Sequence, residues 1–488
     1  MAFADVYKKK AVPFYPQPNT GTILDISAGN WVKGHKGQNI LNGGYALFWV
    51  IAALPNMFKS ALAAAAAAAV LRAFLKSQMH VHDTETTMVH ERVERLTRLA
   101  MHIKLANMKA PENLMSEGRM FFTSSVDYDG TQVTNLLKEF AKSREKNETK
   151  IDLEIVDSSN GKPYKYWTPM IEFWDSLSGL KAESATQLID EGNVGTKELN
   201  MLAMRVNSGK SQIVEQLPDL TAKYGIYFCG TAHVGQTYQL DPNKPNVRVL
   251  KHLKGDVKLK RVPENLSFHT GNCYVITSME VLKDKEKKPF YPYERGDQDD
   301  QAVDLIRLKL INQRGKFGIS GVPIPMVVSQ KDGLIGEMSN FDYLKEDAGR
   351  FGIVGDNTNY ALALTPTLKV SRTTIRQTFR DNYAMINAAR VLMEMHWMFT
   401  YWTDFDFDLV CEPTQLYEDI KKLGYDWDIL LNTRYWHMSI EEGKDIPFLS
   451  TKDLLEMRLG RYHPHWYPKT RKEMELPGTA SQGSVPKK

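Results

Sequence analysis

The stretch Phe48–Val70 constrains this chain most, because a short break joins an apolar run to an alanine-rich run. The apolar run Phe48–Ala53 predicts a buried strand, and Leu54–Phe58 interrupts it. Lys59-Ser60 then opens a run rich in alanine, the best helix former. This order is the layout of a phosphate-binding loop. In such a loop, backbone N–H groups and Lys hold phosphate, and Ser ligates Mg²⁺.

The loop departs from the usual pattern G-x-x-x-x-G-K-[ST], because Ala53 and Phe58 stand where the two glycines belong. A residue with a Cβ costs roughly 1–2 kcal/mol wherever the backbone needs positive φ. Phosphate binding can offset such a cost, and an ordinary strand-turn-helix remains the alternative. If the loop binds nucleotide, the contacting residues are Pro55, Asn56, Met57, Phe58, Lys59, Ser60 and Ala61.

Length and composition set broad limits. A chain of 488 residues suggests two to four domains, and a net charge of +4 means that any nucleic-acid surface must be local. Three cysteines lie far apart, which gives no disulfide or zinc framework and favours a reducing compartment. We expect no signal peptide, and the most apolar stretch, Phe48–Leu75, is interrupted by Pro55 and Lys59. We therefore expect a cytoplasmic protein without a membrane partner.

Polar side chains follow three further predicted strands. Met79–Glu85 ends in Asp-Thr-Glu, Pro169–Leu180 contains a strand that ends at Asp175-Ser176, and Tyr224–Thr231 leads to His233. Ligands of parallel sheets bind at the carboxyl ends of strands. Asp175 matches a Walker B aspartate, which holds Mg²⁺ through water from the strand beside the phosphate-loop strand. The alternatives are that Glu85 is a surface acid and that His233 is a turn histidine.

The other expected elements carry less chemistry. Leu199–Val206 and Ile213–Tyr224 are predicted as two helices, and Asn312–Lys316 as a polar turn. Three histidines lie near one another in sequence but lack the spacing of a metal site: His80, His82 and His90. The remaining predictions are a strand at Arg119–Ser124, a helix at Thr131–Lys142, and adjacent antiparallel strands at Cys273–Leu282 and Ala302–Ile311.

Val234–Gly271 shows no convincing periodicity and has an excess of Lys and Arg. A loop of this length is usually functional or disordered, and its charge suggests contact with nucleic-acid phosphates. The alternative is a solvated, charged hairpin. The proline-rich start, Met1–Thr20, is expected to be a disordered arm or a tether to a neighbouring subunit.

Taken together, the order of these motifs resembles the RecA family of recombinases over roughly Thr20–Gly336. The UvsX-like branch of T4-type phages is the most similar, since an aromatic residue can replace the second glycine there, and a phage source is expected. The matching segments are His82–Glu85, Phe173–Leu177, Glu191–Gly195, Phe268–Asn272 and Arg307–Arg314.

The resemblance implies an α/β fold: a RecA-like P-loop NTPase core with a central, mostly parallel twisted sheet, plus a helix-rich C-terminal domain. It divides the chain into an arm (1–20), an ATPase core (21–364), a helical domain (365–468) and a disordered tail (469–488).

It also implies a DNA-dependent ATPase that forms filaments on single-stranded DNA for pairing, strand exchange and repair, with ATP and Mg²⁺. Lys59 and Ser60 would hold the β/γ-phosphates and Mg²⁺, Glu85 would orient the attacking water, and His233 would sense the γ-phosphate. Arg314 and Lys316 would reach the site of the next copy. Expected partners are single- and double-stranded DNA, further copies, and a recombination mediator or single-strand-binding protein. Expected DNA contacts are Lys197, Arg248, Lys251, Lys254, Lys258, Lys260 and Arg261.

Two departures keep rival interpretations open. His233 replaces the glutamine usual in this family and is more typical of ring helicases, so a ring helicase is the first alternative. Asn312 stands at one of the two cation positions that usually flank the trans turn, with Lys316 as its substitute. The second alternative is a scaffold whose altered phosphate loop no longer turns over ATP.

Overall fold

The structure is a computed structural model of the 488-residue chain. The residues that it describes are 14–25, 29–99, 113–147, 150–181, 196–235, 258–294, 304–315, 318–402, 405–433, 437–440 and 447–468, with side chains omitted at 196–207 and 258.

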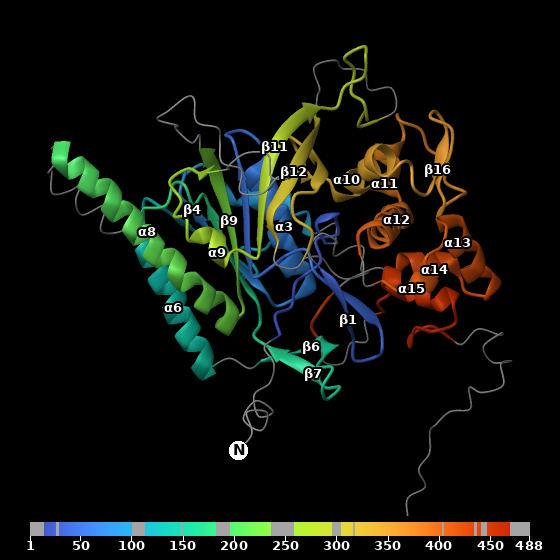
Figure 1. Cartoon of the computed structure of the whole chain (residues 1–488), viewed down its shortest axis with the longest axis horizontal. Coiled ribbons are helices and arrows are strands. Elements are labelled where there is room, and N and C mark those ends of the chain that lie inside the picture. Colours follow the sequence, from blue (N-terminus) through green and yellow to red (C-terminus); the bar gives the residue numbers. More distant parts are fainter. Residues whose placement is uncertain are drawn as a thin grey trace, which may run out of the picture.

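The centre of the molecule is a mixed, mostly parallel sheet (Figure 1). Its strands run in the order β14-β13-β12-β11-β3-β9-β8-β4-β5, and β10 pairs with β9 off this path. Pairs from β11 to β5 are parallel, whereas β11–β12, β12–β13, β13–β14 and β9–β10 are antiparallel. The strands are β3 (Phe48–Ala53), β4 (Gln78–Asp83), β5 (Met120–Ser124), β8 (Met170–Asp175), β9 (Ile226–Gly235), β10 (Lys258–Leu259), β11 (Asn272–Val281), β12 (Leu305–Gly315), β13 (Pro323–Ser329) and β14 (Gly333–Leu334).

The predicted α/β fold is thus confirmed, but one adjacency was wrong. β8, which carries Asp175, pairs with β4 and β9 and not with β3. β9 lies between β3 and β8 because it pairs in parallel with both. The sequence could not reveal this, since β9 follows β8 in the chain and both strands read as buried apolar runs.

Strand β3 is buried on both faces, and a short loop connects it to α3 (Lys59–Ala73). Its side chains alternate between two hydrophobic clusters: Phe48 and Val50 belong to one, and Trp49 and Ile51 to the other. Nearly all of α3 is buried. The small alanine side chains let this helix lie close to the sheet and to α4 (His90–Thr97).

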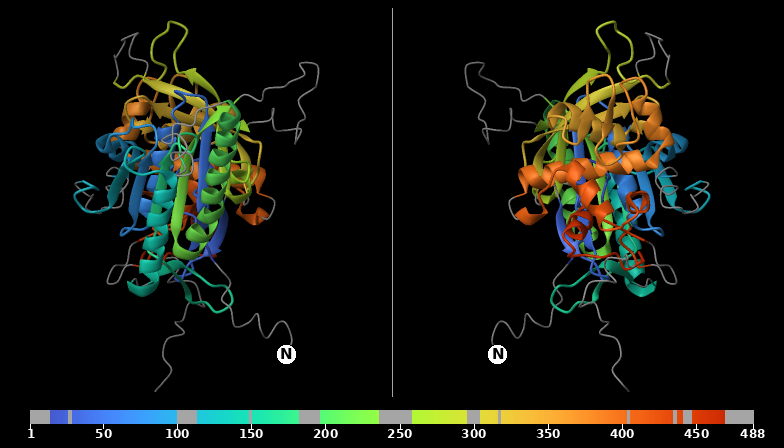
Figure 2. Two further views of the ribbon diagram at one scale, coloured as in Figure 1. Left: turned by 90° about the vertical axis from the view of Figure 1, so that its left-hand side faces the viewer. Right: turned by 90° about the vertical axis from the view of Figure 1, so that its right-hand side faces the viewer.

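The opposite face of the sheet is covered by α6 (Gly130–Asn147) and α8 (Thr196–Tyr224), which face the viewer in the left view of Figure 2. The two helices predicted within Leu199–Tyr224 are one continuous helix of 29 residues. Its weak helix formers at Asn207–Gly209 do not end it. Side chains at Ile213, Val214 and Leu217 pack against the sheet, and this packing outweighs local propensity.

The predicted polar turn at Asn312–Lys316 was also wrong in part, because β12 continues through Gly315. Asn312 is fully buried and pairs with Tyr274 of β11, and Arg314 pairs with Cys273. Ladder hydrogen bonds to β11 therefore hold this polar sequence in an extended form. Within the part of the chain that the structure describes, three small two-stranded sheets flank the core: β1 (Asn30–Lys33) with β2 (Asn39–Asn42), β6 (Ile151–Val156) with β7 (Pro163–Tyr166), and β15 (Ile353–Gly355) with β16 (Tyr360–Leu362).

The region after the sheet is helical, as expected, and lies on the side away from α6 and α8 (Figures 1 and 2). Its side chains belong to the same hydrophobic cluster as α3. Asn39 also donates to Asp453 over 2.7 Å. The division at residue 365 into a separate domain stays a prediction. The helices of this region are α10 (Gly336–Asp342), α11 (Ile375–Asp381), α12 (Tyr383–Tyr401), α13 (Pro413–Lys422), α14 (Trp427–Asn432) and α15 (Thr451–Arg458), with η1 (Tyr343–Asp347) and η2 (Phe407–Leu409). The short helix α9 (Leu266–His269) lies earlier in the chain, between β10 and β11.

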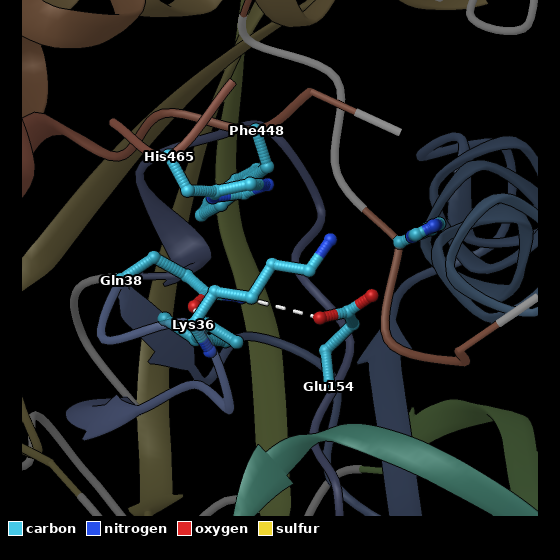
Figure 3. A pocket seen from close by; sticks show the side chains of 7 residues that line it. Lys36, Gln38, Glu154, Phe448 and His465 are labelled. Carbon is cyan, nitrogen blue, oxygen red and sulfur yellow. Dashed lines mark hydrogen bonds between the residues drawn. The ribbon is translucent and has the colours of Figure 1, made fainter. Parts of the chain in front are cut away.

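Segments far apart in the chain meet at a small cavity beside β6 (Figure 3). Gln38 donates to Glu154 over 3.2 Å, and Phe448 and His465 from the C-terminal region close the cavity. Residues 16–20 also lie buried, and Pro16 accepts a hydrogen bond of 2.6 Å from Tyr227. Most of the predicted arm, residues 1–13, lies outside the described residues. Within the described ranges, no helix combines the length and apolar character that a membrane span needs.

Candidate functional site

The phosphate loop forms with an open helix N-terminus. Phe58 precedes α3 with a φ of 58°, and Asn56 has a φ of 61°, so both occupy the left-handed region. Ala53 lies within β3 and does not, so a Cβ causes strain at the second glycine position and not at the first. Among the described residues, no side chain caps α3, and its first turn holds no acid. Its first N–H groups are thus suited to bind an anion.

Lys59 supplies a cation within this loop. Its residue is 8% exposed, and its ammonium lies 3.5 Å from the carbonyl of Leu54. Burial lowers the pKa of Lys59, while the charges of Asp175 and Glu85 oppose that effect. The three residues that the sequence assigned to nucleotide chemistry therefore share one electrostatic environment.

Asp175 ends β8 and is buried. The Thr231 hydroxyl donates a hydrogen bond to its carboxylate. Burial raises the pKa of Asp175, and the nearby hydroxyls of Ser60 and Thr231 oppose the rise. The peptide bond that follows, Asp175–Ser176, is cis. Ser60 and Asp175, the two predicted metal-binding residues, thus lie close enough for the hydroxyl to affect the pKa of the carboxyl group.

Glu85 and His233 form a second pair beside the first. His233 Nε2 lies 2.9 Å from Glu85 Oε1, and Ser176 donates its hydroxyl to the same oxygen over 2.7 Å. Partial burial raises the pKa of Glu85, but the bonds from His233 and Ser176 lower it below its ordinary value. Asp83 accepts the backbone N–H of Glu85 over 2.9 Å, which fixes the turn after β4. The carboxylate is therefore ionised and oriented at neutral pH.

Strand register explains why these residues converge. Ala53 pairs with His233, and Asp83 pairs with Asp175, so β3, β4, β8 and β9 all end at one edge of the sheet. Hydrogen bonds continue beyond the strands. Thr84 donates to the carbonyl of Ser176 over 2.8 Å, and the N–H of Leu177 donates to the carbonyl of Thr231 over 2.8 Å. Hydrogen bonds to Thr84 after β4 and to Thr231 in β9 therefore fix the turn after β8 on both sides.

These groups fit a triphosphate with Mg²⁺. A hard cation of this size prefers oxygen ligands and keeps several waters, so it needs few protein ligands. The Ser60 hydroxyl and the Asp175 carboxylate offer such oxygens beside the Lys59 cation and the open end of α3. No group of three or more His, Cys, Asp or Glu that could hold a metal occurs among the described residues. In particular, His80 pairs with Glu172 over 2.8 Å and with Thr123 over 2.9 Å.

Arg314 lies apart from this constellation. Arg314 pairs with Cys273 of β11, and Cys273 pairs with Val50 of β3. Arg314 is therefore level with a position three residues before the end of β3, and it lies two strands away from β3. Its guanidinium contacts the carbonyl of Phe268 over 3.4 Å. The second predicted trans cation, Lys316, lies outside the described residues. A role for either residue in the site of another copy stays a prediction.

Only part of the predicted DNA surface is described. Arg248, Lys251 and Lys254 lie outside the described residues; Lys197 lies in α8 and Lys258 in β10, both with side chains omitted. Lys260 follows β10, and its N–H donates to the carbonyl of His233 over 2.7 Å. Arg261 has a φ of 55°. The described end of the basic segment Val234–Gly271 is therefore hydrogen-bonded directly to His233 of the site.

Sequence reasoning missed four residues that organise the site: Thr84, Ser178, Lys210 and Thr231. Ser178 accepts the N–H of His233 over 2.9 Å, and Thr231 holds Asp175. A hydroxyl two residues before His233 on a buried strand was an available signal for Thr231, because buried hydroxyls need partners. No comparable pattern marked Lys210, since its contacts come from distant segments.

Comparisons with known proteins add little. No protein-family model matches the chain, and no curated protein sequence matches it either. Among solved structures, the chain is similar to one whose title describes an ATPase domain, at 14% sequence identity and a TM-score of 0.31. That match covers 59% of this chain and 84% of the other. A TM-score this low supports no inference, so the interpretation rests on the strand order and on the geometry of the site.

Proposed function

We propose that this chain binds and hydrolyses ATP with Mg²⁺ and uses that cycle on DNA as a filament-forming recombinase. The observation that carries the proposal is the convergence of Lys59, Ser60, Asp175, Glu85 and His233 at one edge of the sheet. A cation, an open helix end, an oxygen pair for Mg²⁺ and an oriented carboxylate are the groups that phosphoryl transfer to water requires.

In the proposed mechanism, each group has one task. Lys59 and the N–H groups of α3 neutralise and position the phosphates. Ser60 and Asp175 would hold Mg²⁺, which would supply charge neutralisation when bound. Glu85, kept ionised by His233 and Ser176, accepts a hydrogen bond from the attacking water and orients it. Catalysis then comes mainly from positioning and electrostatics.

The assignment to DNA strand exchange rests on further features. The sequence resembles RecA-family recombinases at the motifs above, and the segment after β9 is rich in lysine and arginine. Arg314 stands away from the site of its own chain, which suits a cation that completes the site of an adjoining copy. In that case hydrolysis depends on polymerisation.

Two assays test the proposal together. Single-stranded DNA should stimulate phosphate release by the full chain, and negative-stain images with an ATP analogue and DNA should show helical filaments. Closed rings with DNA-stimulated hydrolysis would instead favour a helicase, for which His233 at the strand tip is the supporting observation. Absence of ATP binding and hydrolysis would leave a scaffold, which the strained Phe58 favours.

A further inference from the structure

Lys210 of α8 is a buried cation outside the constellation described above. Its residue is 2% exposed. Its ammonium donates to the carbonyl of Arg261 over 2.9 Å and lies 3.4 Å from that of Ser178 and 3.5 Å from that of Leu177. No carboxylate pairs with it among the described residues, so three backbone carbonyls meet its charge.

Two of these carbonyls belong to the turn after β8. The same turn touches the site twice: Ser178 accepts the N–H of His233 over 2.9 Å, and Ser176 donates to Glu85 over 2.7 Å. A displacement of the turn would therefore move both members of the Glu85–His233 pair. Lys210 therefore links α8 to this turn through the carbonyls of Leu177 and Ser178.

The third carbonyl belongs to the other side of His233. Arg261 follows Lys260, whose N–H donates to the carbonyl of His233 over 2.7 Å. β10 also pairs with the end of β9, Lys258 with Gly235. Lys210 thus connects the turn after β8 to the residues after β10, and His233 is bonded to both.

The chemistry of Lys210 is unusual for a residue that only fills space. Burial, and then the nearby charge of Arg261, lower its pKa to about 8. A methionine could fill a similar volume without the desolvation cost of a buried ammonium. The ammonium instead contacts three backbone carbonyls at once. These carbonyls belong to the turn after β8 and to Arg261, which no strand pairing joins.

We propose that Lys210 is a positioning residue that couples Lys260 and Arg261, which follow β10, to the Glu85–His233 pair. The inference rests on the proposed function and deepens it, since it assigns a route by which nucleic acid bound near β10 raises the rate of hydrolysis. Lys210 touches neither nucleotide nor water in this scheme. Lys210 holds the turn after β8 and Arg261 at a fixed separation, so that a displacement of either one moves His233.

The test compares K210M with K223M in the full chain. Lys223 lies on the same helix, with a side chain 64% exposed and paired to Glu145 over 2.9 Å, so K223M controls for loss of a lysine from α8. Phosphate release is measured with and without oligodeoxythymidylate, and affinity is measured with a fluorescent ADP analogue. K210M should lower the oligonucleotide-stimulated rate about tenfold or more, and change nucleotide Kd less than about threefold. K223M should match wild type.

Two further readouts separate positioning from simple loss of stability. K210R keeps the charge and N–H donors, and should return to within about threefold of the wild-type rate. In hydrogen exchange, K210M should deprotect the N–H groups of His233 and Lys260, which K223M should leave protected. K210Q, which is neutral and keeps the two N–H donors of an amide, replaces K210M where that variant does not fold.

The outcomes are distinct. If wild type neither binds nor hydrolyses nucleotide, the proposed function fails, and the exchange experiment still tests the connection itself. If wild type is stimulated and K210M is stimulated equally, or if exchange at His233 and Lys260 is unchanged, the coupling role of Lys210 is wrong.

Discussion

His233 Nε2 and Glu85 Oε1 lie 2.9 Å apart although β8 separates their strands in the sheet. The pair reaches across the end of β8, where Ser176 donates to the same carboxylate oxygen. Two donors therefore fix the orientation of Glu85 before any nucleotide binds. This pre-orientation is what a water-positioning carboxylate needs.

Replacing Glu85 by Gln should lower ATP hydrolysis about 10²- to 10³-fold, because an amide cannot accept the proton of the attacking water. Nucleotide binding should persist, since Glu85 is not a phosphate ligand in this account. Phosphate release and nucleotide titration measure the two effects. E91Q is the matched control: Glu91 has a side chain 65% exposed and pairs with His90 over 3.0 Å. Equal rates for E85Q and wild type would remove Glu85 from the mechanism.

Replacing Thr231 by Val should weaken the Mg²⁺ site. Without the hydroxyl, the pKa of the buried Asp175 rises further, since that hydrogen bond favours the ionised carboxylate. We expect about a tenfold increase in the Mg²⁺ concentration for half-maximal hydrolysis, equal to ~1.4 kcal/mol. T221V controls for a buried hydroxyl lost elsewhere, because Thr221 bonds to the carbonyl of Pro218 over 2.9 Å. An unchanged Mg²⁺ dependence in T231V would contradict the assignment.

We expect the stability of the protein to depend on pH through Asp25, in a way that does not involve the proposed nucleotide site. Its carboxyl is fully buried, and burial raises its pKa to about 7, against hydrogen bonds from Thr20 and the charge of Arg390. The folded state then holds a proton that the unfolded state releases above about pH 4. Stability from this group is present at low pH and falls as pH rises toward 7, by up to about 1.4 kcal/mol per unit.

The D25N variant has no such titration, so denaturant midpoints of wild type and variant, compared from pH 5 to pH 7, isolate the effect. D25N should be less stable at pH 5, because its amide nitrogen cannot accept the N–H of Gly21, which Asp25 Oδ2 accepts over 2.7 Å. The gap should narrow as pH rises. A gap that is constant or widens would show that Asp25 is ionised in the folded protein.

Much of this arrangement was accessible from the sequence. Apolar runs followed by Lys59-Ser60, Glu85 and Asp175 predicted the strand ends, because a parallel sheet buried on both faces needs continuous apolar strands. The adjacency of β8 and β9, and the contacts of Thr231 and Lys210, were not accessible. They depend on strand order and on hydrogen bonds between segments far apart in the chain, which leave no local pattern.

Predictions from local sequence propensity were wrong at two further places, because tertiary packing and strand pairing outweighed propensity there. The helix α8 continues through Asn207–Gly209 because its apolar face is packed against the sheet. The strand β12 continues through a polar sequence because β11 provides ladder partners up to Gly315. The phosphate loop gave a mixed result: the expected strain is present at Phe58 and absent at Ala53.

The central claim is that four strand ends and one open helix terminus form a triphosphate site around Lys59. The most direct measurement is a titration of Mg²⁺·ATP into wild type and K59A at neutral pH, with a melting curve for each. K59A should bind at least about 100-fold more weakly, equal to ~2.7 kcal/mol. It should melt no lower than wild type, because it relieves a buried ammonium whose pKa burial depresses. Equal affinity in the two proteins, or no binding by wild type, would contradict the account.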